Sequence, residues 1–156
     1  MPVRFLRNAS ELADVSWETP LPVQVANAKP VPADTLLVAT LTVDTTARDL
    51  LGSTAAELPT LDNCGQYRKL VWFAHRASNT AINYTIRARA TDLAGTPLSS
   101  GWQTLASGTF AADSTNPNWV RLDIPATGDG YYDQYRIEVS VASGTVALTS
   151  KIVGVR

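Results

Sequence analysis

Short segments of alternating apolar and polar residues follow one another through most of the chain, separated by clusters of Gly, Asn, Asp and Pro. A side-chain period of two is typical of half-buried β-strands, so the pattern predicts an antiparallel all-β domain with almost no helix. The first strand is expected over residues 35–44. One of its faces carries Leu37 and Leu41, and the other carries Leu36 and Val38. Because both faces are partly apolar, we expect a central position in a sheet.

The clearest hairpin is predicted between residues 67–76 and 82–90. The side chains of the first arm that should face the core are Leu70, Trp72 and Ala74. In the second arm Arg87 and Arg89 alternate with apolar residues and should point to solvent. A shift of one residue would bury both arginines, so we expect a firmly fixed register.

Further segments complete the predicted domain, including two short ones around residues 102–105 and 108–110. Residues 119–124 should form a strand with Trp119 on its exposed face or under a loop. Residues 134–142 and 145–155 should form a second hairpin, with Arg136 pointing to solvent. The inward residues of its first arm should be Tyr135, Ile137, Val139 and Val141. The total of seven or eight strands over roughly 120 residues predicts an antiparallel β-sandwich that resembles a jelly roll.

The first 32 residues have a different pattern. Residues 17–32 contain four prolines around the short extended element Val-Gln-Val-Ala. Each proline fixes φ and removes a hydrogen-bond donor, so this stretch can be neither a central strand nor a helix. Residues 8–12 could form one helical turn capped by Asn8. We therefore divide the chain into an extended N-terminal arm, residues 1–32, and a β-sandwich domain, residues 33–156.

The composition narrows the possible functions. The chain has 156 residues, of which 45% are hydrophobic, which is enough for one domain with a sizeable core. Charged residues make up 17%, and 13 basic against 14 acidic residues give a formal net charge of -1. No general field attracts nucleic acid or an anionic membrane, so we expect neither as a partner. No secretory signal and no long apolar run are recognisable, which predicts synthesis in a cytoplasm and no membrane span.

Catalytic chemistry has few candidates. With one Cys, one His and one Met, the chain cannot build a zinc cluster or an internal disulfide by itself. His75 lies within a strand and Cys64 within a turn, and no nucleophile motif accompanies either, so structural roles are favoured for both. Some acidic residues are close enough in sequence to suggest glycoside hydrolysis or calcium binding. They are Asp123, Asp129, Asp133 and Glu138. They occupy turn positions or alternate with arginines, and we expect no enzyme activity, metal or cofactor.

The aromatic and arginine residues suggest binding. The aromatic residues that could form a platform for sugars are Trp17, Trp72, Trp102, Trp119, Tyr131 and Tyr132. The alternative is that Trp72 is core, Trp17 anchors the arm, and Trp102 and Trp119 cover sheet edges or contact other subunits. The arginines expected on outward strand faces or their ends are Arg68, Arg76, Arg87, Arg89, Arg121 and Arg136. With only three lysines in the chain, these arginines favour a protein interface over a nucleic-acid groove.

Two segments carry a family resemblance. They are an extended Pro-Val-rich arm, PLPVQVANAKPVPADT, and a closing hairpin, QYRIEVSVASGTVALTSKIVGVR. The chain resembles small virion proteins of tailed bacteriophages, and among these the jelly-roll decoration or cement proteins of capsids. The resemblance implies a homotrimer that binds the major capsid protein or other virion proteins and stabilises the shell. It also implies that the protein is located in the virion.

The residues expected to contact partners under this hypothesis are Trp17, Pro20, Leu21, Pro22, Val23, Val25, Trp102 and Trp119. The alternative function is a carbohydrate-binding or receptor-binding sandwich of a phage tail, baseplate or fibre. In that case the exposed aromatic side chains would contact the ligand.

Overall fold

The structure is a computed structural model that describes residues 3–8, 11–15, 33–98, 101–112 and 119–156. The chain divides into two compact units, Met1–Pro30 and Val31–Arg156. Within the described ranges no helix is long and apolar enough to cross a membrane.

The first unit contains an antiparallel hairpin of β1 (Val3–Asn8) and β2 (Glu11–Val15). Asn8 pairs with Glu11, so the helical turn considered for residues 8–12 is wrong. Alternating β-branched and aromatic residues favour paired strands, whereas a single helical turn has no neighbouring turns to support it.

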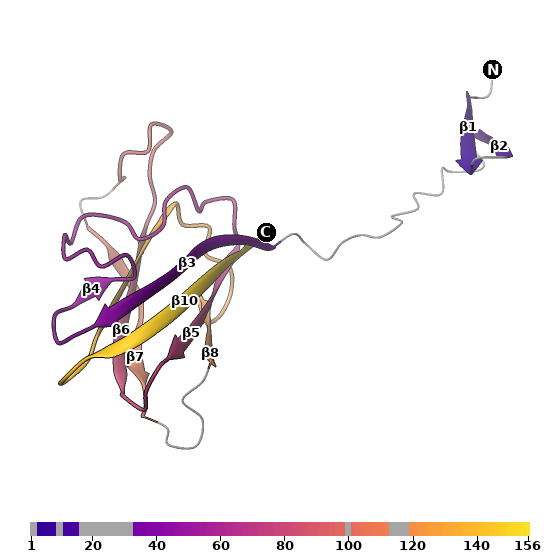
Figure 1. Cartoon of the computed structure of the whole chain (residues 1–156). Coiled ribbons are helices and arrows are strands. Elements are labelled where there is room, and N and C mark those ends of the chain that lie inside the picture. Colours follow the sequence, from indigo (N-terminus) through magenta and orange to yellow (C-terminus); the bar gives the residue numbers. More distant parts are fainter. Residues whose placement is uncertain (1–2, 9–10, 16–32, 99–100, 113–118) are drawn as a thin grey trace. The chain divides into compact units, whose positions relative to one another are not determined.

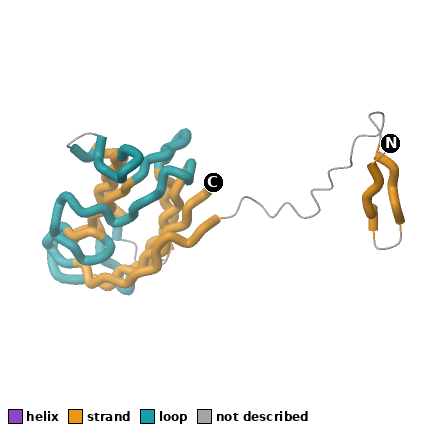
Figure 2. Tube along the Cα trace, turned by 90° about the horizontal axis from the view of Figure 1, so that it is seen from above, coloured by secondary structure: helices purple, strands orange, loops and turns teal. Residues whose placement is uncertain are grey.

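The second unit is a sandwich of two four-stranded antiparallel sheets (Figure 1, Figure 2). Its strands are β3 (Ala33–Val43), β4 (Arg48–Asp49), β5 (Lys69–Arg76), β6 (Ile82–Arg89), β7 (Gln103–Phe110), β8 (Trp119–Ile124), β9 (Gln134–Ser140) and β10 (Val146–Val155). The β10 sheet has the order β3-β10-β5-β8, and the β9 sheet has the order β4-β9-β6-β7. The described residues contain no helix, and the predicted all-β sandwich is confirmed.

The strand pairing has a simple order. β3 pairs with β10, β4 with β9, β5 with β8, and β6 with β7. The chain therefore forms one long antiparallel ribbon that turns back between β6 and β7. The ribbon is rolled so that β10 also pairs with β5 and β9 with β6. This is the strand arrangement of a jelly roll, in agreement with the predicted architecture.

Both predicted hairpins are wrong, although their strands exist. β5 lies in the β10 sheet and β6 in the β9 sheet, so residues 77–81 cross from one sheet to the other. Residues 141–145 make the same kind of crossing between β9 and β10. A short turn can join two strands within a sheet or across a sandwich, so the local sequence does not distinguish the two arrangements.

β3 is an edge strand, not the central strand expected from its two partly apolar faces. Within the described residues it pairs with β10 alone. Val43 on its inner face is buried, whereas Val38 on its outer face is 66% exposed. Val38 therefore belongs to an open surface of the sheet, whereas Leu36 is partly buried against the core.

The core lies between the two sheets, with Trp72 fully buried at its centre. The Trp72 indole Nε1 donates a hydrogen bond to Ser150 Oγ at 3.1 Å. The Trp72 ring meets those of Tyr84 and Phe110 edge-on, at centroid distances of 6.0 and 5.2 Å. The predicted inward residues that are buried here are Leu70, Trp72, Ala74, Tyr135, Ile137, Val139 and Val141.

Three arginines expected at the surface are buried, namely Arg76, Arg89 and Arg136. Each lies on a strand, and its guanidinium group binds loop carbonyl oxygens or side chains that cover it. Arg76 Nη1 lies 2.6 Å from the carbonyl oxygen of Ala111 and 3.1 Å from that of Phe110. Guanidinium donors thus satisfy carbonyl groups that loops would otherwise leave without partners. The predicted exposure of these three arginines is therefore wrong.

Arg136 makes the most complete of these contacts. Its Nη1 donates to the Leu58 carbonyl oxygen at 2.6 Å, and its Nε donates to Glu138 Oε1 at 3.0 Å. Arg89 holds the same loop, because its Nη2 donates to the Glu57 carbonyl oxygen at 3.0 Å. The two arginines therefore hold Glu57 and Leu58 over the outer face of β9 and β6, a position that strand alternation assigns to solvent.

We expect Arg136→Ala to lower the free energy of unfolding by about 3 kcal/mol, because the substitution leaves buried loop carbonyls without a charged donor. Arg136→Lys should restore part of the loss, since an ammonium group cannot reproduce the planar fork. Arg121→Ala is the matched control, because the Arg121 side chain is 62% exposed, and it should cost less than about 1 kcal/mol. Chemical denaturation measures all three. Equal losses for Arg136→Ala and Arg121→Ala would contradict a structural role of the buried group.

Candidate functional site

The outer face of the β10 sheet is the candidate binding surface. Its four strands lie side by side in Figure 1, and directly paired residues of a sheet point to the same side. The pairings therefore define two neighbouring rows across this face, made of Val38, Lys151, Phe73 and Arg121, and of Thr40, Thr149, His75 and Trp119. We call these eight residues the Trp119 face.

A shallow depression of about 250 Å³ is lined by Phe73, Trp119 and Lys151. The Trp119 side chain begins the edge strand β8 and is 59% exposed, as its position in the sequence predicted. Its ring centroid lies 5.1 Å from that of His75, with the planes tilted by 43°. The depression thus offers a large accessible aromatic surface next to an ammonium group.

The side of the β10 sheet that carries the Trp119 face has an excess of positive charge. Asp123 pairs with Lys69 at 3.4 Å and with Arg121 at 3.0 Å. Lys151 has no ion-pair partner among the described residues. Lys69, Arg121 and Lys151 against Asp123 give three positive charges and one negative, a net charge of +2 on this side of a protein whose total is -1.

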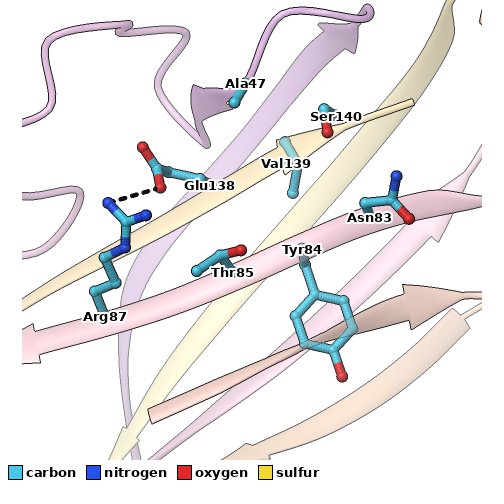
Figure 3. Close-up of a pocket in the computed structure, with 8 residues that line it drawn as sticks. All are labelled: Ala47, Asn83, Tyr84, Thr85, Arg87, Glu138, Val139 and Ser140. Carbon is cyan, nitrogen blue, oxygen red and sulfur yellow. Dashed lines mark ion pairs between the residues drawn. The ribbon is translucent and has the colours of Figure 1, made fainter. Parts of the chain in front are cut away.

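The outer face of the β9 sheet is different, because the loop held by Arg89 and Arg136 covers part of it. A smaller depression of about 150 Å³ remains, and its lining is Ala47, Asn83, Tyr84, Thr85, Arg87, Glu138, Val139 and Ser140. Figure 3 shows Arg87 on β6 and Glu138 on β9 facing each other, with Nη1 3.3 Å from Oε2. The charges at this depression are therefore paired with one another.

The predicted aromatic residues do not form one platform. Trp72 is core. Trp119 begins β8, whereas Trp102, Tyr131 and Tyr132 lie in or beside loops that precede β7 and β9, at the opposite end of the strands. The Trp102 ring packs under the Arg89 guanidinium carbon at 4.0 Å, and so supports a buried arginine. The structure thus separates Trp102 from Trp119.

The predicted contacts in the arm, Trp17, Pro20, Leu21, Pro22, Val23 and Val25, lie outside the described residues, as does the Pro-rich segment that contains them. Their part in partner binding stays a prediction.

Sequence reasoning did not connect Phe73 and Lys151 with Trp119. Alternation along β5 correctly put Phe73 and His75 on one outward face, but the connection needs the pairing of β5 with both β8 and β10. Phe73, Trp119 and Lys151 are more than 30 positions apart in the chain, so only the fold brings these residues together.

Cys64 is buried and unsuited to nucleophilic chemistry. Burial, with the nearby carboxylates of Asp62 and Asp133, raises the pKa of its thiol to about 12. Burial also raises the pKa of the Tyr135 hydroxyl to about 12. Neither group is poised to exchange a proton near neutral pH.

Tyr67, Asp34 and Arg156 form a polar cluster beside the start of β3. Tyr67 Oη donates to Asp34 Oδ2 at 2.8 Å, and Arg156 Nη2 donates to the same oxygen at 2.7 Å. The Tyr67 hydrogen bond and the Arg156 charge lower the pKa of Asp34, and the same bond to Asp34 raises the pKa of Tyr67. The cluster links the start of β3 to the residue after β10 and therefore has a structural role.

The acidic residues considered for catalysis are dispersed. Asp129 pairs with Arg68 at 3.8 Å, and the Asp133 carboxylate accepts a hydrogen bond from the Thr91 backbone amide at 2.7 Å. In the described ranges no group of three or more His, Cys, Asp or Glu side chains could hold a metal ion. The carboxylates therefore act within the fold.

Comparison with protein-family models and with curated proteins found no match for this chain.

We expect Cys64 not to react with a thiol reagent in the folded protein at pH 8, because at a pKa of about 12 only about one thiol in 10,000 is ionised, and burial blocks access. Full labelling should appear once denaturant unfolds the sandwich. The absorbance of the chromogenic thiol that the reagent releases measures labelling in the folded and in the unfolded protein. Rapid stoichiometric labelling without denaturant would show that Cys64 is accessible and reactive.

Proposed function

We propose that the protein is a structural component of a tailed-bacteriophage virion, a capsid decoration protein that binds the outer shell as a homotrimer. In this proposal residues 1–32 contact the major capsid protein or another virion protein, and the sandwich of residues 33–156 is displayed on the shell. The resemblance of the arm and of the closing strands to cement proteins supports this assignment.

The observation that carries the proposal is the separate N-terminal unit with its hairpin of β1 and β2. A hairpin of two strands is marginally stable by itself in water, because it cannot bury enough apolar surface. Docking on a partner, or pairing with a strand of the partner, would stabilise it. The four prolines in residues 17–32 would lower the entropy lost when this part is ordered on a shell.

The properties of the sandwich are consistent with an assembly role. Its buried ionisable groups hold loops, and its carboxylates pair with arginines, lysines or backbone amides. A shell protein that acts through surface complementarity requires a rigid fold and no titrating group.

Deletion of residues 1–32 should leave a folded sandwich that no longer binds the particle, since the docking element is lost. Circular dichroism and thermal unfolding check the fold, and co-sedimentation with purified shells that lack the protein measures binding. Phe5→Pro in the full chain should weaken binding in the same way, because proline at a paired position of β1 disrupts the hairpin.

Leu93→Ala is the matched control, because it alters an exposed side chain of the sandwich and leaves residues 1–32 unchanged. It should sediment with the shells like the unmodified protein. Shell binding by the truncated sandwich at full strength would rule out docking through the N-terminal unit, and failure of the full chain to bind any virion surface would rule out the proposed function.

A further inference from the structure

We propose that the Trp119 face binds an acidic saccharide, with one sugar ring stacked on the Trp119 indole and an anionic group of the sugar next to Lys151. This inference stands apart from the proposed shell binding, because it uses residues of the sandwich alone.

The stacking surface is the exposed part of the Trp119 ring. Tryptophan is large and is usually well buried, so a ring that is 59% exposed on the face of a sheet is available to a ligand. The C–H groups on one side of a pyranose ring present an apolar surface to such a ring. Phe73 forms the floor beside it, and the depression of about 250 Å³ is smaller than the pockets that hold drug-sized ligands. One or two sugar rings suit this size.

The charge of the surface selects an anionic ligand. Arg121 is already paired with Asp123 at 3.0 Å, whereas Lys151 has no ion-pair partner within the part of the chain that the structure describes. Lys151 lines the same depression as Trp119, and its long side chain would let the ammonium group meet a carboxylate or sulfate of a sugar that stacks on the ring. The net charge of +2 on this side of the sheet adds a weaker long-range attraction, which salt screens.

A second copy of the same chain fits this surface poorly. The open face of four strands measures roughly 20 by 30 Å from ordinary strand spacings, or about 600 Å², which is below the ~800 Å² per partner of a stable interface. Packing the face on itself around a two-fold axis would also bring the same positive side chains together. An anionic partner avoids this repulsion.

A saccharide fits better than an acidic peptide. An extended peptide gains affinity chiefly from main-chain hydrogen bonds along the free edge of a sheet. Phe73 and Lys151 lie on β5 and β10, the two interior strands, whose backbone groups already pair on both sides. At Phe73 and Lys151 recognition must therefore come from side chains, and a peptide could pair only with the free edge of β8, beside Trp119. A ring to stack on, a cation, and the nearby Thr149 and His75 are what an acidic sugar requires.

The experiment uses the full chain on an array of uronic-acid, sialylated and sulfated oligosaccharides, with neutral oligosaccharides and the methyl esters of the uronic acids beside them. Titration of the best acidic oligosaccharide then gives its affinity. We expect the methyl ester to bind about two- to fivefold more weakly, which is the range of one exposed ion pair, and we expect added salt to reduce the difference.

The variants separate the two contacts. Trp119→Ala should weaken binding at least about tenfold, because it removes the stacking surface. Lys151→Gln should abolish the preference for the acid over its ester, and Lys151→Arg should retain it. Tyr131→Ala, which removes an aromatic side chain of similar exposure elsewhere (55% against 59%), should bind like the unmodified protein. Deletion of residues 1–32 should also leave saccharide binding unchanged, which separates this inference from shell binding.

The inference is overturned if no acidic oligosaccharide binds better than its neutral counterpart, or if Tyr131→Ala weakens binding as much as Trp119→Ala. It is also overturned, in favour of a peptide partner, if a hexaglutamate peptide binds through Trp119 more tightly than every acidic oligosaccharide on the array.

Discussion

Three buried guanidinium groups hold the loops of this sandwich in place. Arg76 binds the carbonyl oxygens at the end of β7, and Arg89 and Arg136 bind those of the loop that follows β4. Without these guanidinium groups the buried loop carbonyls would have no hydrogen-bond donor, and burying a carbonyl without a donor costs free energy. The arginines beneath the loop after β4 therefore help to hold it over the outer face of the β9 sheet, together with the backbone pairing of Thr60 and Leu61 with Tyr135.

This covering makes the two outer faces unequal. The β9 sheet is partly hidden, and the charges at its remaining depression are paired as Arg87 with Glu138. The β10 sheet stays open and presents Trp119, Phe73 and an ammonium group without an ion-pair partner among the described residues. Burial raises the pKa values of the Cys64 thiol and the Tyr135 hydroxyl, so both groups stay protonated near neutral pH. Surface contact, on the open face and through the N-terminal unit, is the role that this arrangement favours.

Alternation of residues was enough to predict the all-β class, the strands and most of the core, because a period of two reports directly which side of a strand is covered. The same rule failed at Arg89 and Arg136, since the cover over them is a loop that comes from another part of the chain. It also failed to predict strand pairing. A jelly roll pairs β3 with β10 across the whole domain, and the short turns after β5 and β9 carry no signal that distinguishes a crossing from a hairpin.

The exposed position of Trp119 was predictable from one strand, whereas its neighbours Phe73 and Lys151 were not, because they come from two other strands. The hairpin of β1 and β2 was missed for a different reason. Its strands are short, and the capping residue Asn8 suggested a helical turn in the same place.

In the proposed arrangement residues 1–32 attach the protein to the shell, and the Trp119 face remains free. Oxidative footprinting by hydroxyl radicals tests it most directly, because Trp17 and Trp119 report on the two parts of one chain. On shell-bound protein, compared with free protein, the account predicts that Trp17 becomes protected while Trp119 is oxidised at an unchanged rate. Protection of Trp119 together with an unchanged rate at Trp17 would contradict it.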